Sequence, residues 1–162
     1  MESQEPSEQT AAAAELLERR RVEIVSDAEA ALARAHSRHY ETAGMEAVHK
    51  RLELLYDHLL QALEHRDLAP TIAYAEQVAE ERFTAGFDLA EVQTAFNALE
   101  EATWARVFAE LEPSEFAEAL GLVSTILGAA KDALARRYVS LATDTHTPSL
   151  DLQALFAGTE GA

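Results

Sequence analysis

The sequence predicts an all-α fold, a single-domain helical bundle of about five major helices that could be globin-like. Apolar residues recur at the three- and four-residue spacings of a helix face, and the well-patterned segments lack the alternation of a half-buried strand. The breaks between segments fall at glycine and proline. With 162 residues, the chain suits one domain that can bury a sizeable core. We expect a flexible acidic leader over 1–10, the bundle over 11–142 and a tail over 143–162.

The first helix is predicted over "AAAAELLERRRVEIVSDAEAALARAH". Its apolar face contains Leu16, Ile24, Ala28, Ala31 and Ala35. The segment Val25–Asp27 in its middle contains residues that compete with the helix backbone, so it could bend or end the helix. Two shorter helices are therefore the alternative. At the end of this region, His36, His39 and Tyr40 suit a helix C-terminus, where imidazoles satisfy free carbonyl groups.

The second and third helices each have a clear apolar seam. In the second helix the seam comprises Met45, Val48, Leu52, Leu55, Leu59 and Leu63. In the third helix, which begins near Pro70, it comprises Ile72, Ala75, Val78, Ala79 and Phe83. Both seams are expected to face other helices.

The stretch "AGFDLAEV" predicts a sharp corner between the third and fourth helices. Gly86 can adopt the left-handed conformation that ends a helix, and Asp88 can cap the next one. Glu91 lies three residues after Asp88, as in a capping box. Phe87 precedes the cap and is expected to pack on Val92. These contacts would set the angle between the two helices.

The fourth and fifth helices are the most apolar. The fourth, over 89–111, places Trp104 and Phe108 beside a stripe of Val92, Phe96, Leu99, Thr103 and Val107. The fifth starts at Pro113 and has a seam that runs from Phe116 to Leu141. Gly121 and Gly128 are interpreted as tolerated helix glycines, with close helix approach as the alternative.

The tail contains turn-forming residues followed by a short amphipathic helix. Its apolar side chains are Leu150, Leu152, Leu155 and Phe156. They either fold back onto the bundle or form a partner-binding surface.

Composition argues against several partners. The net charge of −16 repels nucleic acid and anionic membrane surfaces. No apolar run approaches the length of a membrane span, and the first residues are polar and acidic, unlike a secretory signal. The chain has no cysteine, which suits a reducing compartment. We therefore expect a cytoplasmic protein with neither a nucleic-acid nor a membrane partner.

Metal and cofactor sites are not expected. Glu46 and His49 form the Glu-x-x-His spacing of di-iron bundles, but the second copy that such a site needs is missing. No histidine lies between His65 and His146, where a globin would need its haem ligand. The alternative is a metal-binding enzyme or carrier that uses Glu46, His49 and His58 with further carboxylates. No catalytic triad or phosphate loop is visible, so we expect no catalytic residue.

Two binding features are expected of the bundle. A candidate ligand pocket lies in the gap among the second, third and fourth helices, with Trp104, Phe96, Tyr56 and His58 as its residues. The first and fifth helices have more apolar surface than a small monomeric bundle needs, which favours a homodimer through them.

The run from Leu54 to Phe108, with Arg82, Gly86, Phe87, Leu89, Glu91 and Val92 at its corner, resembles the N-terminal helical domain of RsbR/RsbRD-type co-antagonists of the RsbT kinase. These proteins belong to the stressosome, a bacterial stress-signalling assembly. The resemblance implies a non-haem, globin-like sensor module, commonly dimeric, that passes a signal to an attached STAS output domain. This chain ends soon after its last long helix, so we expect it to act alone, to be a piece of a longer protein, or to signal through a separate protein partner.

Overall fold

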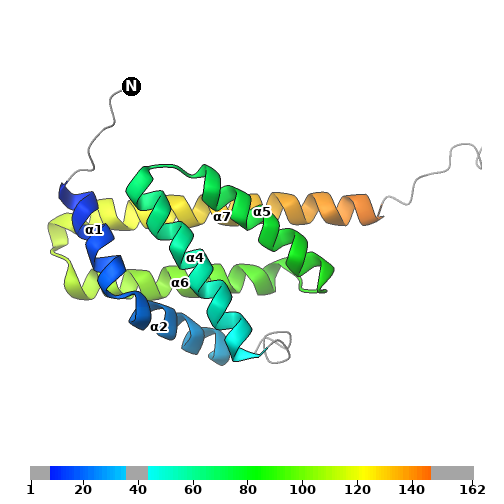
Figure 1. Cartoon of the computed structure of the whole chain (residues 1–162), viewed down its shortest axis with the longest axis horizontal. Coiled ribbons are helices and arrows are strands. Elements are labelled where there is room, and N and C mark those ends of the chain that lie inside the picture. Colours follow the sequence, from blue (N-terminus) through cyan, green and yellow to red (C-terminus); the bar gives the residue numbers. More distant parts are fainter. Residues whose placement is uncertain (1–7, 36–43, 147–162) are drawn as a thin grey trace, which may run out of the picture.

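The computed structural model describes residues 8–35 and 44–146 as a bundle of helices (Figure 1). Over these ranges it contains six helices and no strand: α1 Glu8–Arg19, α2 Arg21–Arg34, α4 Met45–His65, α5 Ala69–Thr84, α6 Leu89–Glu110 and α7 Pro113–His146. The all-α single-domain prediction is confirmed. The two long helices α6 and α7 run antiparallel, and α4 crosses them in Figure 1. The core lies between these helices and α1, α2 and α5.

The predicted first helix is divided into α1 and α2, which confirms the alternative of two shorter helices. The break occurs at Arg20, however, and not at Val25–Asp27, which lie within α2. Val25 is completely buried, so core packing holds this segment in the helix. Near the actual break, the carbonyl oxygen of Leu17 accepts a hydrogen bond of 2.6 Å from the hydroxyl of Tyr56 in α4. In an uninterrupted helix that carbonyl would accept from the backbone N–H of Arg21.

The apolar seam of α4 packs into the core from Val48 onward. Its buried members are Val48, Leu52, Leu55, Leu59 and Leu63. Met45, which the spacing also placed in the seam, is 56% exposed because it is the first residue of the helix. The helix ends at Arg66, whose φ is 52°, and Asp67 Oδ1 then accepts a hydrogen bond from the backbone N–H of Ala69. This turn leads directly into α5.

The corner between α5 and α6 has the predicted geometry. Gly86 has a φ of 85°, and its N–H donates to the carbonyl of Phe83, while the N–H of Phe87 donates to the carbonyl of Arg82. This pair of bonds is the Schellman arrangement that satisfies the last carbonyls of a helix. Asp88 then caps α6 by accepting a 2.9 Å bond from the N–H of Glu91. The left-handed glycine and the aspartate cap are thus confirmed.

Two further residues of this corner, Phe87 and Val92, are part of the hydrophobic core. The side chains of Phe87 and Val92 are both buried, with 7% and 2% of their surface exposed. The hydroxyl of Tyr138 in α7 donates a 3.2 Å hydrogen bond to the carbonyl oxygen of Phe87. The long helix α7 is therefore hydrogen-bonded to the backbone of the corner.

The stripes of α6 and α7 face the core as predicted. On α6 the buried residues include Val92, Phe96, Leu99, Thr103 and Val107, whereas Trp104 and Phe108 are 37% and 54% exposed. A Cβ atom built on Gly121 or Gly128 in α7 would meet no atom within 4 Å. Within the described chain, neither glycine is needed for a close approach between helices.

Candidate functional site

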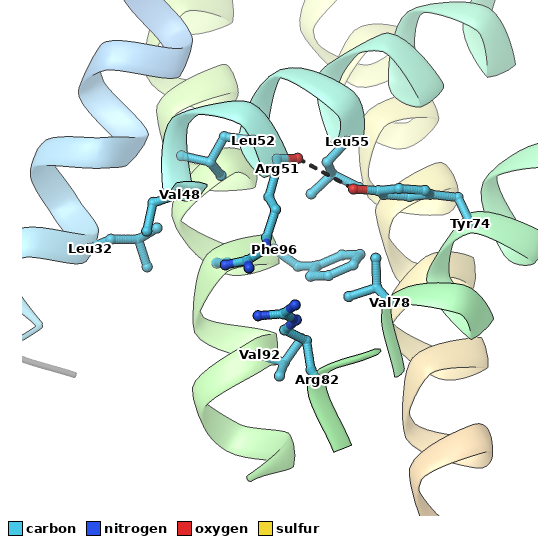
Figure 2. A pocket seen from close by; sticks show the side chains of 11 residues that line it. Leu32, Val48, Arg51, Leu52, Leu55, Tyr74, Val78, Arg82, Val92 and Phe96 are labelled. Carbon is cyan, nitrogen blue, oxygen red and sulfur yellow. Dashed lines mark hydrogen bonds between the residues drawn. The ribbon is translucent and has the colours of Figure 1, made fainter. Parts of the chain in front are cut away.

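A cavity lies between α4, α5 and α6, with one residue of α2 at its edge (Figure 2). The space open to the centre of a water-sized sphere is about 30 Å³. Most of its walls are aliphatic or aromatic; the lining residues are Leu32, Val48, Arg51, Leu52, Leu55, Tyr74, Val78, Arg82, Val92, Ala95 and Phe96. Only two of them carry a charge, and both charges are positive.

Arg51 from α4 and Arg82 from α5 extend into this cavity, and Figure 2 shows their guanidinium groups pointing towards one another near Phe96. The Nε atom of Arg82 is buried and has no hydrogen-bond partner among the described residues. The guanidinium carbon of Arg82 lies 5.1 Å from the centre of the Phe87 ring, so a cation–π contact holds its orientation. The cavity thus has a positively charged end and apolar walls.

The other lining polar group is a neutral phenol. Burial raises the pKa of Tyr74 to about 12, so its hydroxyl stays protonated at physiological pH. That hydroxyl lies 3.4 Å from the backbone carbonyl oxygen of Arg51, to which it donates. The tyrosine adds no negative charge to the cavity.

His58 lies behind Tyr74, outside the lining. The two rings are stacked with their centres 4.4 Å apart. Burial lowers the pKa of His58, and its Nδ1 atom is buried with no hydrogen-bond partner in the described part of the chain. The ring is therefore held mainly in its neutral form.

The residues predicted for the ligand pocket occupy three different places. Phe96 lines the cavity and His58 stacks against one of its walls. Tyr56 is fully buried against α1. Trp104 lies over an open surface depression, which it shares with Asn97, Glu100, Glu101 and Lys131.

Sequence reasoning missed the two arginines. Arg51 lies next to Leu52 in the α4 seam, and Arg82 follows Val78 by one helical turn. A charged residue that adjoins an apolar seam on each of two helices was the available signal. It was not decisive, because long basic side chains often reach solvent from such positions.

The residues of the metal alternative have other contacts. His49 Nδ1 is paired with Glu29 of α2, and its Nε2 lies 3.7 Å from a carboxylate oxygen of Glu53. Glu46 is exposed. Over the ranges 8–35 and 44–146, no three His, Cys, Asp or Glu side chains form a group that could hold a metal ion.

Two further sets of predicted residues lie outside the described residues. The first set is His36, His39 and Tyr40, and the second set is the tail residues Leu150, Leu152, Leu155 and Phe156. Among the helices that are described, none has the length and apolar character needed to cross a membrane.

Comparison with known proteins identifies the family. A family model described as the RsbT co-antagonist protein rsbRD N-terminal domain matches residues 13–148. The match extends from within α1 to the end of α7 and includes the cavity and the α5–α6 corner. No curated protein and no solved structure matches the chain. Because the family model covers most of its length, the chain belongs to the family of RsbT co-antagonist protein rsbRD N-terminal domains.

Proposed function

We propose that this chain is a cytoplasmic sensory and regulatory module of bacterial stress signalling, which acts as a homodimer by binding another protein. The observation that carries the proposal is the family match over residues 13–148. The family is a regulatory one, and its description names a co-antagonist of RsbT. The RsbT kinase, or a protein that binds RsbT, is therefore the proposed partner.

The proposed partner surface is the apolar part of the tail, which comprises Leu150, Leu152, Leu155 and Phe156. Apolar side chains grouped in this way are suited to burial against a partner. A competing surface lies on α6, where Trp104 and Phe108 are exposed one turn apart. The ring of Phe108 also meets that of Phe116 edge to face, with centres 5.0 Å apart. Exposed aromatic residues of this kind are enriched at protein interfaces.

Isothermal titration calorimetry with purified RsbT from the same organism tests the proposal. We expect a complex with the full chain, loss of binding when residues 148–162 are removed, and binding by the double variant Trp104→Ala/Phe108→Ala. Met45→Ala is the matched control, since Met45 is a 56% exposed apolar residue at the start of α4, outside the proposed dimer surface. If only the double variant loses binding, the contact lies on α6. If the full chain itself forms no complex at micromolar concentration, RsbT is not the partner.

Elemental analysis of the purified protein tests the metal-binding alternative separately. Glu46, His49 and His58 all lie on α4, but His49 is paired with Glu29 and His58 stacks on Tyr74. A bound metal at one ion per chain, lost in His49→Gln, would overturn the regulatory proposal in favour of a metalloprotein.

A further inference from the structure

We propose that the cavity between Arg51 and Arg82 binds a short-chain aliphatic monocarboxylate. The carboxylate would lie on the two guanidinium groups, and the hydrocarbon end would pack against Phe96 and Val78. This ligand goes beyond the proposed function, because the cavity binds it with no protein partner present.

The charge of the cavity is opposite to that of the protein. The whole chain has a net charge of −16, yet the described residues that line the cavity include two arginines and no aspartate or glutamate. Other arginines form ion pairs between helices, such as Arg20 with Glu110 at 2.7 Å and Arg137 with Glu80 at 2.7 Å, whereas the Nε of Arg82 has no hydrogen-bond partner among the described residues. A site whose described lining is positively charged is suited to an anionic ligand.

Arg82 supplies the specific donor. Its buried Nε lacks a hydrogen-bond partner among the residues described, and an unsatisfied buried donor lowers the stability of the ligand-free protein. The planar guanidinium group matches a carboxylate through two parallel hydrogen bonds. The contact with the Phe87 ring already fixes the side chain, so little orientational freedom is lost on binding.

The size and the walls select the ligand among anions. The space of about 30 Å³ counts only the positions open to the centre of a water-sized sphere, so the cavity itself is larger and has room for a carboxylate with a very short chain. The rest of the lining is apolar, including Leu55, Val78 and Phe96. Phosphate would press hydrated oxygens against these walls, and an uncharged alcohol would supply no negative charge to the buried Nε–H of Arg82. A longer chain would require the helices to move apart.

Solution NMR of the full chain with propionate as the ligand tests this proposal. We expect saturable shifts of the Arg82 Nε–H signal and of the Phe96 ring signals. Arg82→Met should weaken binding about tenfold or more, because it removes charge-assisted hydrogen bonds. Arg137→Met is the matched control, since Arg137 pairs with Glu80 away from the cavity. This variant should bind propionate with the affinity of the wild-type protein.

Further arms separate the alternatives. Circular dichroism establishes that Arg82→Met is folded, and Arg51→Met provides a second variant from the other helix that should also weaken binding. Equal affinity for n-propanol would overturn the role of charge, and equal affinity for phosphate would overturn the role of the apolar walls. The site is absent if propionate causes no saturable shift below about 100 mM. None of these results depends on RsbT, so failure here leaves the proposed partner binding intact.

Discussion

The hydroxyl of Tyr56 donates a hydrogen bond of 2.6 Å to the backbone carbonyl oxygen of Leu17, and both side chains are completely buried. Burial raises the pKa of Tyr56 well above its usual value, so the phenol remains a donor over the physiological range. The bond joins α4 to the end of α1, next to the break at Arg20. A single side chain thus connects α4 to the place where the predicted first helix is divided into α1 and α2.

Tyr56→Phe is expected to lower the free energy of unfolding by about 1–3 kcal/mol, because it leaves the Leu17 carbonyl buried without its donor. Tyr74→Phe is the control: its hydroxyl bond is longer, at 3.4 Å, and the residue is only half-buried. The loss there should be smaller. Urea unfolding followed by circular dichroism measures both, and equal losses would contradict the importance of the Leu17 contact.

Gly86→Ala should destabilise the protein by about 1 kcal/mol or more, because Gly86 has a φ of 85°, where an alanine is strained. Gly121→Ala is the opposite case. Gly121 lies inside α7 and its added Cβ meets no atom within 4 Å, so the change should stabilise the protein by up to about 1 kcal/mol. Thermal unfolding distinguishes the two, and an unchanged Tm for Gly86→Ala would count against the corner.

The burial of His58 predicts a loss of stability in mild acid. The folded state has the lower pKa, so the unfolded chain binds more protons once the pH falls below the ordinary value of 6.5. Stability should therefore fall as the pH is lowered from about 7 to 5, and His58→Gln should flatten that dependence. Urea unfolding at several pH values measures the slope. His65→Gln is the control because His65 is exposed, and an unaltered slope in His58→Gln would show that other groups cause the dependence.

Removing residues 148–162 should abolish partner binding while helicity and Tm stay nearly unchanged. The reason is that the apolar residues of the tail are proposed to cover a partner and not the bundle. Circular dichroism and calorimetry measure the two properties on the same samples. A loss of several kcal/mol in stability with binding preserved would instead make the tail a part of the core.

The protein is expected to be a homodimer through the first helices and α7. Val22 in α2 and Val139 in α7 are 74% and 62% exposed, which leaves apolar surface for a second copy. Multi-angle light scattering should give twice the 17.7 kDa mass of one chain at micromolar concentration. A monomer mass would remove this proposal.

Local rules predicted the α5–α6 corner because its geometry depends on neighbouring residues. Gly86 tolerates a positive φ and Asp88 supplies a cap, and both effects act within one turn. The seams of α4 and α6 were predictable for the same reason, since helical spacing places their apolar residues on one face. Met45 departed from the pattern because the first residue of a helix need not reach the core.

The candidate site was predicted only in part. Phe96 was expected at a pocket and lines the cavity, but the grouping with Trp104 assumed that residues of neighbouring helices face the same gap. Which side of α6 meets α4 and α5 depends on how the helices pack. The residues that line the cavity could therefore not be predicted from the apolar pattern within a single helix.

The amino-acid sequence alone determined the helical class, the ends of α5 and α6 and the apolar faces, since propensity, capping and periodicity act over a few residues. The tertiary structure decided the break at Arg20 and the meeting of Arg51 with Arg82. Tyr56 lies thirty-nine positions from Leu17, and Arg82 lies on a different helix from Arg51. Such contacts arise only when helices pack, because packing sets which side chains face one another across the bundle.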